Sequence, residues 1–347
     1  MLFEFLYPNV WDALKESSLP IVLYGMGNGA DKVLDEFEKR KIRAAGVMAS
    51  EGFVRHQSFR SFTVKSEKEL TDELEDFLVV LCFGSNLSDV MDAVRRVGER
   101  HPLLVPNVPV CGSEILDDAY LSEHREEIAK AYGLLTDVQS KKVFKGALDF
   151  LYTGRLSYLS LIESEKAEVF ENILKLKNER YLDLGAYRGD TVEEFLTYTD
   201  GYEHITALEP NPKNFEKLKE YAGRVERVTV INGGVSDSDG VMYVSKNSGR
   251  MAALSEETGT EVKVFSVDSL SCSPTYIKAD VEGCERRMID GMARTLKTKP
   301  KLNIAAYHRT GDFFSLLLLI HKIQPSYRFY LRKHPYIPCW DLNLYAV

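Results

Sequence analysis

Residues 181–191 read YLDLGAYRGDT, and this stretch decides how the C-terminal half of the chain folds. A short apolar strand contains Asp183, runs into a turn with two glycines, and leads into a predicted helix. A second strand, predicted at His204–Leu208, ends in Glu209-Pro210-Asn211. Glycines allow a backbone to approach a ligand closely, and an acid at the end of the next strand can accept hydrogen bonds from both ribose hydroxyls. The two strand ends therefore predict a nucleoside cofactor site.

The composition sets limits on the class of protein. At 347 residues the chain can form two domains, each with its own core. The net charge of −8 argues against a nucleic-acid partner, whose phosphates attract basic surfaces. Five cysteines occur without a CxxC pair, which indicates reduced thiols and not a disulfide frame or a zinc site. We expect a cytoplasmic location.

Two segments bear on targeting and on membranes. The N-terminal stretch has no basic region and contains Glu4, so it is not interpreted as a secretory signal. The longest apolar run, residues 313–320, is far shorter than the roughly 20 residues that cross a bilayer. No membrane span is expected.

The chain is predicted to contain two α/β blocks that are joined by helices. In residues 1–112, a strand at 19–24, the turn Gly25-Met26-Gly27 and a helix at 31–39 precede further strands, which is typical of a Rossmann-like domain with a parallel sheet. Residues 113–178 are rich in Glu, Lys, Ala and Leu and are expected to form two or three connecting helices. Residues 179–347 are the second block.

The second block is predicted to contain a mostly parallel sheet of seven strands that ends in an antiparallel hairpin. Sheets that bind S-adenosylmethionine typically finish in such a hairpin, whereas NAD-binding sheets normally finish with a parallel sixth strand. The predicted helices lie at 191–198, 211–222, 285–293 and 313–323. The predicted strands are 181–184, 204–208, 228–233, 275–279, 302–306, 327–333 and 342–346.

Four segments of this block resemble the FkbM family of S-adenosylmethionine-dependent methyltransferases. They are residues 183–191, Ala-Leu-Glu-Pro-Asn at 207–211, the Lys-x-Asp-x-Glu-Gly-x-Glu pattern at 278–285, and Tyr307-His308 with the later Leu-Tyr-Ala at 344–346. The resemblance covers about residues 163–347. It implies a class I methyltransferase fold, S-adenosylmethionine as the cofactor, and O-methylation of a hydroxyl on a sugar, glycan or natural-product-like small molecule.

The resemblance also implies roles for the residues at the strand ends. Asp183 would anchor the amino group of the methionine part, Glu209 would bind the ribose, and Tyr187 replaces an asparagine common in the family, which would alter the pocket near the methionine tail. Other roles stay open, because Asp190 and Thr191 can simply cap a helix, and residues 236–237 suit an ordinary turn. The predicted cofactor-binding residues are Asp183, Gly185, Tyr187, Gly189, Asp190, Thr191, Glu209, Pro210, Asn211, Ser236 and Asp237.

A second group of polar residues follows the fourth and fifth predicted strands. Asp280 and His308 are the predicted catalytic residues, because a base within reach of an acceptor hydroxyl makes it a better nucleophile. Alternatively, a divalent metal held by Asp280 and Glu282 could lower the pKa of that hydroxyl. Glu285 is interpreted as a capping acid of the next helix and is left out of the catalytic set.

Other functions stay open at this point. The first block has a dinucleotide-type glycine turn but no acid at the end of its second strand, where Glu51 comes late. It is interpreted either as a vestigial or protein-contact domain or as one that binds a nucleotide or nucleotide sugar. An NAD-dependent oxidoreductase and a non-catalytic nucleotide-binding scaffold are the alternative functions. Because no large insertion is expected in the second block, we hypothesise that the connector and the first block help to wall the acceptor site.

Overall fold

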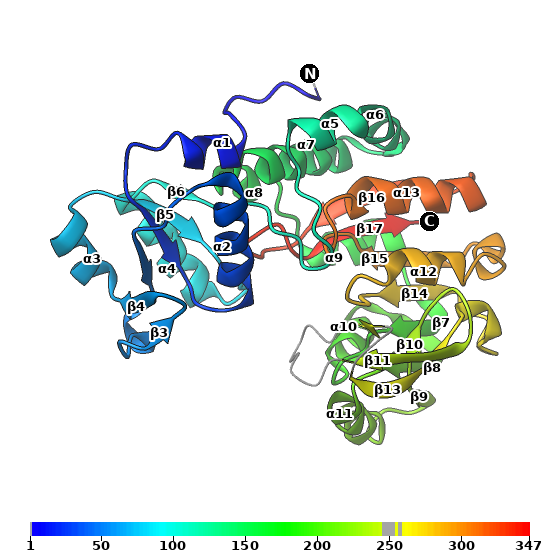
Figure 1. Cartoon of the computed structure of the whole chain (residues 1–347). Coiled ribbons are helices and arrows are strands. Elements are labelled where there is room, and N and C mark those ends of the chain that lie inside the picture. Colours follow the sequence, from blue (N-terminus) through cyan, green and yellow to red (C-terminus); the bar gives the residue numbers. More distant parts are fainter. Residues whose placement is uncertain (1, 245–253, 256–258) are drawn as a thin grey trace.

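A computed structural model describes residues 2–244, 254–255 and 259–347 of the chain. Figure 1 shows an N-terminal unit, blue to cyan, beside a C-terminal unit, green to red, with the helices that connect them along one side. Both units are α/β, and both main sheets are mostly parallel, as predicted. None of the helices in the described ranges combines the length and the apolar character that a membrane crossing requires.

The sheet of the N-terminal unit has six strands in the order β3-β4-β2-β1-β5-β6. The central strands β1 (Ile21–Tyr24) and β5 (Leu78–Leu81) are apolar and buried along their whole length, as expected for a parallel sheet covered on both faces. The strand order reverses between these two strands, so their carboxyl ends flank a topological switch point. The other strands are β2 (Gly46–Met48), β3 (Ser58–Phe59), β4 (Phe62–Lys65) and β6 (Leu103–Leu104), of which only β3 pairs antiparallel.

Helices α2, α3 and α4 accompany this sheet. The predicted glycine turn is present, and Gly25 adopts a φ of +116°, a conformation that favours glycine. Sequence analysis missed the short strands β3, β4 and β6, which have too few residues to show a clear pattern. The helices of the unit are α1 (Val10–Lys15), α2 (Asn28–Arg40), α3 (Glu67–Leu74) and α4 (Ser88–Arg100).

The connector contains more helical segments than the two or three predicted. Its longest helix, α7 (Val138–Thr153), begins where the Asp137 carboxylate accepts a hydrogen bond from the Ser140 N–H at 2.7 Å. It ends at Gly154, which adopts a φ of +68°. The remaining segments are α5 (Asp118–Glu123), α6 (Arg125–Leu134), α8 (Ser157–Ser160), α9 (Lys166–Glu168) and a π-helical turn at Val169–Leu174.

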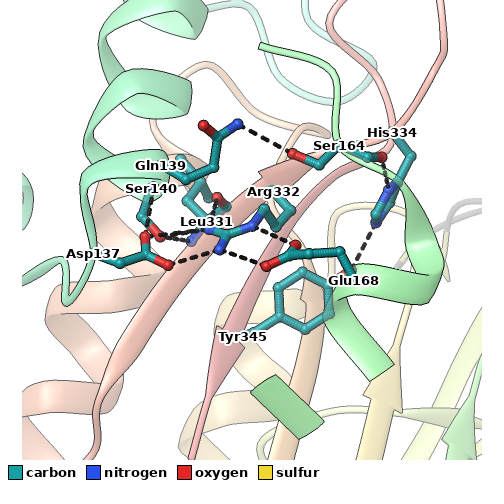
Figure 2. Close-up of polar contacts among 9 residues, drawn as sticks. All are labelled: Asp137, Gln139, Ser140, Ser164, Glu168, Leu331, Arg332, His334 and Tyr345. Atoms are coloured by element: carbon teal, nitrogen blue, oxygen red, sulfur yellow. Dashed lines mark hydrogen bonds and ion pairs between the residues drawn. The ribbon is translucent and has the colours of Figure 1, made fainter. Parts of the chain in front are cut away.

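A buried arginine fastens the connector to the C-terminal sheet (Figure 2). Arg332 lies on strand β16 (Phe329–Lys333) and is 2% exposed. Its guanidinium group contacts Asp137 at 2.7 Å and Glu168 at 3.0 Å, on two different connector segments. Its Nη1 also donates to the Ser140 hydroxyl at 2.8 Å. Loss of either carboxylate would leave the buried Arg332 charge with a single carboxylate partner, which is unfavourable. This cluster therefore fixes the connector on the sheet.

The sheet of the C-terminal unit has seven strands in the order β16-β17-β15-β14-β7-β8-β9. Every pair is parallel except the two that involve β17, which runs antiparallel to both neighbours, so the closing hairpin is present. The strands are β7 (Lys177–Leu184), β8 (Asp200–Glu209), β9 (Val228–Asn232), β14 (Tyr276–Ala279), β15 (Lys301–Ala305), β16 and β17 (Leu342–Ala346). The helices are α10 (Asp190–Tyr198), α11 (Pro212–Ala222), α12 (Glu285–Asp290) and α13 (Asp312–Ile323).

A second, four-stranded sheet lies between β9 and β14 in the sequence. Its order is β10-β13-β11-β12. This corrects the expectation that the second block carries no large insertion. Sequence analysis leaves residues 236–237 open between an ordinary turn and a cofactor contact, and the chain does bend at 237–239, but the alternating pattern of β13 after them is not recognised there as a strand. The strands are β10 (Gly234–Val235), β11 (Gly240–Val244), β12 (Leu254–Ser255) and β13 (Thr260–Phe265).

One apolar core is continuous through both units and the connector. It includes Leu81 of β5, Phe144 and Leu148 of α7, and Phe313 and Leu344 of the C-terminal unit. All five side chains are 2% exposed or less. Since interiors are close-packed and stiff, the surfaces where the units meet have a defined shape.

Candidate active site

A cavity of about 320 Å³ lies at the carboxyl ends of the C-terminal sheet. Strands β7, β8, β14 and β15 all end at its wall, the edge at which open α/β sheets bind ligands. The volume lies within the range of ligand cavities, roughly 300–1,000 Å³. The predicted site residues on its wall are Gly185, Tyr187, Asp190, Thr191, Glu209, Pro210, Asp280, Glu282 and His308.

The glycine turn after β7 packs directly against the end of β14. Gly185 has a φ of +82°, and a Cβ atom there would lie 2.0 Å from the carbonyl oxygen of Asp280. Gly189 has a φ of +100°, and its Cβ would lie 2.5 Å from the ring of Tyr221. Any other residue would push the turn away at both positions, so the two glycines set the shape of the cavity floor.

Glu209 ends strand β8 with its carboxylate held from both sides. Oε2 accepts from the backbone N–H of Tyr187 at 2.9 Å, and Oε1 accepts from that of Asn211 at 2.8 Å. The residue is 5% exposed, and this burial raises the pKa of Glu209 to about 7 despite the two N–H donors. A carboxylate offers about four acceptor positions, and the Asn214 side chain also hydrogen-bonds to this one, so at least one position stays open for a hydroxyl. This donor and acceptor set fits a ribose.

Asp183 lies behind the cavity wall. It is fully buried, accepts a hydrogen bond from the Thr191 hydroxyl, and lies 4.0 Å from Nζ of Lys278. Burial raises the pKa of Asp183 to about 6, while Lys278 opposes that shift. Thr191 and Lys278 line the cavity, whereas Asp183 does not. Asp183 therefore holds these two wall residues in position from behind.

Four further predicted cofactor residues lie beside the cavity and off its wall. Asn211 caps α11, since its side chain accepts from the N–H groups of Lys213 at 3.0 Å and Asn214 at 3.3 Å. The Ser236 hydroxyl donates to Asp237 at 3.1 Å, and the wall near them is made by residues 233–235. Gly189 contacts Tyr221, as described above. Direct ligand contacts from these four residues stay predictions.

His308 is surrounded by three carboxylates. Its Nδ1 lies 2.8 Å from Oε1 of Glu285, and its Nε2 lies 3.3 Å from Oδ1 of Asp280 and 3.5 Å from Oε2 of Glu282. Burial lowers the pKa of His308, but the three carboxylates outweigh burial and raise it to about 10. This direction favours the imidazolium over the neutral ring, so Asp280 is the stronger candidate for the base, and the catalytic role of His308 stays a prediction.

Glu285 has a larger role than the capping interpretation gave it. It begins α12, and its Oε1 accepts from the N–H of Val281 at 3.1 Å, but the same oxygen holds the His308 ring. The residue is 1% exposed. Two features of the sequence could have indicated the pair of Glu285 and His308. Glu285 is the second acid of the Glu-Gly-x-Glu pattern, and His308 follows the adjacent strand.

The same cluster offers a set of metal ligands. The ligand atoms of Asp280, Glu282 and His308 all lie within 4.8 Å of one another. Two carboxylates and an imidazole suit Mg²⁺, Mn²⁺ or Zn²⁺, and a second carboxylate on the far ring nitrogen, here Glu285, is the usual outer partner of a metal-bound histidine. The residues therefore fit a divalent ion as well as they fit a protonated histidine.

Residues outside the predicted site complete the wall. Lys166 and Phe170 of the connector line the cavity, and Lys166 forms an ion pair with Glu194 of α10. Asn86 and Val110 of the N-terminal unit also line it. Sequence patterns do not show such contacts, because they depend on how the units pack. They agree with the hypothesis that the connector and the first block wall the site.

Comparison with known proteins places this geometry in context. Residues 183–336 match the methyltransferase FkbM domain family. The whole chain is similar to the crystal structure of methyltransferase FkbM from Methylobacillus flagellatus KT, with a TM-score of 0.72 and 20% sequence identity over 100% of this chain and 95% of that one. No curated protein matches the sequence.

More distant likenesses cover about half of the chain. Precorrin-6y C5,15-methyltransferase from Geobacter metallireducens GS-15 has a TM-score of 0.35 and 14% identity over 53% of this chain and 92% of its own. Aeropyrum pernix fibrillarin, solved in complex with S-adenosyl-L-methionine, has a TM-score of 0.32 and 14% identity over 50% of this chain and 67% of its own.

Proposed function

The C-terminal half of this chain belongs to the FkbM methyltransferase family, and from this premise we propose that the protein transfers a methyl group from S-adenosylmethionine to a hydroxyl of a sugar, glycan or natural-product-like small molecule. One observation carries the proposal. A single cavity joins Glu209, which has an open acceptor position, to the Asp280–His308 cluster. We also propose that the seven-stranded sheet is a class I methyltransferase fold, and that residues 1–112 are a second Rossmann-like domain.

Different residues on the wall of the cavity suit the ribose, the adenine and the methionine part of S-adenosylmethionine. Glu209 would accept from the ribose hydroxyls, and residues 233–235 would flank the adenine. Asp190, which is exposed and lines the cavity close to the Gly185 turn, would face the amino group of the methionine part. Lys166, which also lines the cavity and pairs with Glu194, suits the carboxylate of the same part. S-adenosylmethionine supplies an electrophilic methyl group on a sulfonium, whose leaving group is a neutral thioether.

Asp280 is the residue we assign to the acceptor hydroxyl. Its carboxylate is 33% exposed, on the cavity side, and it accepts from the Tyr307 hydroxyl at 3.2 Å. It can accept the proton of the acceptor as the new carbon–oxygen bond forms. The His308 imidazolium, held by Glu285, keeps the Asp280 carboxylate oriented. Holding the nucleophile in line with the methyl group supplies much of the acceleration.

A divalent ion would give the same cluster a second way to act. Asp280, Glu282 and His308 would hold it, with Glu285 behind the histidine. When bound, the ion would supply Lewis-acid stabilisation of an acceptor alkoxide. His308 would then be neutral, because a metal ligand must lose its proton. A test of metal dependence therefore distinguishes a cluster in which Asp280 acts as a base from one in which the residues hold a metal ion.

We propose that three segments divide the work. Residues 179–347 bind the cofactor and carry the catalytic cluster, residues 113–178 form one wall, and residues 1–112 contribute to acceptor binding. The contacts of Asn86, Val110 and Lys166 with the cavity support this division.

The test is binding followed by turnover. The purified protein should bind S-adenosylhomocysteine in calorimetry and should not bind NADH with comparable affinity. With S-adenosylmethionine labelled in the methyl group, it should transfer label to a hydroxyl-bearing sugar or natural product. Failure to bind either adenosyl compound at millimolar concentration would refute the proposal, and tight NADH binding with hydride transfer would favour an oxidoreductase instead.

A further inference from the structure

A second cavity, of about 340 Å³, lies between the two units. On the N-terminal side it is lined by residues 26–29, which follow β1, and by residues 81–84, at the end of β5. These are the two strand ends that flank the topological switch point, where open parallel sheets bind ligands. On the other side it is lined by residues that follow β15 and precede β17.

The second cavity adjoins the cofactor cavity. Val110, Tyr307 and Trp340 line both. Tyr307 stands at the catalytic end, because its hydroxyl donates to Asp280 at 3.2 Å. The junction is also a place where the units touch closely, since a Cβ on Gly84 would lie 2.4 Å from the Trp340 ring. The shared residues therefore bring the second cavity next to the proposed base.

The two cavities differ in charge. Among the described residues, no acidic side chain lines the second cavity, whereas Lys32 and Arg309 do. The cofactor cavity is lined by more acids than cations, and its cations include Lys166 and Lys278. Nζ of Lys32 donates to the carbonyl oxygens of Pro109 at 2.7 Å and Val110 at 2.8 Å, and burial lowers the pKa of Lys32. In the described part of the chain, neither cation has a carboxylate within 4.0 Å. The acids on the wall of the cofactor cavity are Asp190, Glu194, Glu209, Asp280, Glu282 and Asp341.

Unneutralised cations in a partly closed cavity favour an anionic ligand. The whole chain has a net charge of −8, so a cavity with cations and no acids is a local exception. Most of its remaining wall is apolar, with aromatic side chains at Phe83, Phe150 and Trp340. Such a wall suits a planar or ring-shaped body, and the cations suit a phosphate group attached to it.

We propose that this second cavity is the acceptor site and that the acceptor is a phosphorylated sugar, free or linked to a nucleoside diphosphate. Arg309 and Lys32 bind its phosphate groups, the aromatic faces contact its ring or base, and its hydroxyl reaches Asp280 beside Tyr307. This inference rests on the proposed methyltransferase function and names the substrate class for the same site.

The test measures binding of uridine diphosphate and of pyrophosphate to the full-length protein saturated with S-adenosylhomocysteine. We expect wild-type protein to bind uridine diphosphate, and Arg309→Gln to weaken that binding at least tenfold, because it removes a charge-assisted contact. Arg43→Gln is the matched control, since Arg43 is exposed on the N-terminal unit and lines neither cavity. The affinity for S-adenosylhomocysteine should stay unchanged in both variants, which shows that they are folded.

The outcomes separate this inference from the proposed function. If S-adenosylhomocysteine binds but neither uridine diphosphate nor pyrophosphate does at millimolar concentration, the acceptor assignment is wrong and the methyltransferase proposal stands. Equal binding of uridine diphosphate by wild type and Arg309→Gln would also overturn it. A turnover assay with labelled S-adenosylmethionine completes the test. Label should enter a uridine-diphosphate sugar or a sugar phosphate, and label found only in neutral acceptors would contradict the inference. If S-adenosylhomocysteine itself does not bind, the proposed function fails first.

Discussion

Replacement of Glu209 by alanine tests the central contact of the cofactor site. In the structure its two oxygens each accept one backbone N–H, and the Asn214 side chain adds a third hydrogen bond, which leaves at least one acceptor position for a ribose hydroxyl. A hydrogen bond to a charged group contributes about 1.5–3 kcal/mol. Loss of even one such bond would weaken binding at least about tenfold, because about 1.4 kcal/mol corresponds to a factor of ten. We expect Glu209→Ala to lose at least that much affinity for S-adenosylhomocysteine.

The buried position of Glu209 adds a pH dependence whose sign can be worked out. Its pKa is about 7 in the free protein, so about a tenth of the molecules carry the ionised form at pH 6 and about nine-tenths at pH 8. Hydroxyl donors favour the ionised form, so affinity should rise about tenfold from pH 6 to pH 8. The free energy of unfolding of the free protein changes in the opposite direction. Since the folded pKa lies above the ordinary value of 4.5, the folded state binds the extra proton, and this residue's contribution falls as pH rises between 4.5 and 7.

Calorimetry with S-adenosylhomocysteine at pH 6, 7 and 8 measures both effects. Glu203→Ala is the matched control, since Glu203 lies on the same strand, is 56% exposed, and forms an ion pair with Arg180 on the surface. Melting of each free variant shows whether the turn that Glu209 holds has been lost. If Glu209→Ala binds as tightly as wild type, or keeps the same pH dependence, the ribose is held elsewhere and the reasoning fails.

Three further predictions concern the glycine turn and the catalytic cluster. Gly185→Ala should abolish cofactor binding and lower the melting temperature, because its Cβ would lie 2.0 Å from the Asp280 carbonyl oxygen; normal calorimetry for this variant would contradict the proposed cavity floor. Asp280→Asn should reduce turnover by at least about a hundredfold with little change in cofactor affinity, because a base acts mainly in the transition state. If a chelator abolishes wild-type activity and Mg²⁺ or Mn²⁺ restores it, the cluster acts through a metal, and indifference to the chelator favours Asp280 as a simple base. Glu285→Gln should reduce turnover and lower the pKa of His308 from about 10, seen by NMR titration of the ring, while an unchanged titration would exclude the positioning role.

The strand ends of the C-terminal unit could be predicted because their signals are local. Apolar runs that end in Asp183, Glu209 and Asp280 mark strands whose carboxyl ends meet at one edge of the sheet, and the glycines between them mark turns. The predicted strands agree with the observed ones to within a few residues. Extra residues at the start of β7 and β8, such as Lys177 and Asp200, are polar and exposed, so the hydrophobic pattern could not show them.

Packing between distant segments could not be predicted in the same way. The difference between a residue on the cavity wall and one behind it, as for Asp190 and Asp183, depends on side-chain direction within a turn. The pairing of Glu285 with His308 joins a helix start to the end of a neighbouring strand, 23 residues apart. Three carboxylates that only the fold brings together raise the pKa of His308. The histidine that the sequence suggested as a base is therefore proposed to orient Asp280 instead.

The charges of the two cavities lead to one account of how both substrates are placed. A sulfonium cofactor is cationic, and the wall that would receive it contains the acids at positions 190, 209, 280 and 282. An anionic acceptor would be repelled by that wall and attracted by Lys32 and Arg309 in the adjoining cavity. The reacting groups would then meet only at the shared border, where Tyr307 contacts Asp280. After transfer the sulfur is a neutral thioether, so the attraction between the acidic wall and the cofactor weakens. If the two substrates bind as proposed, the same charge distribution that keeps them apart until they reach Tyr307 would also favour release of the used cofactor.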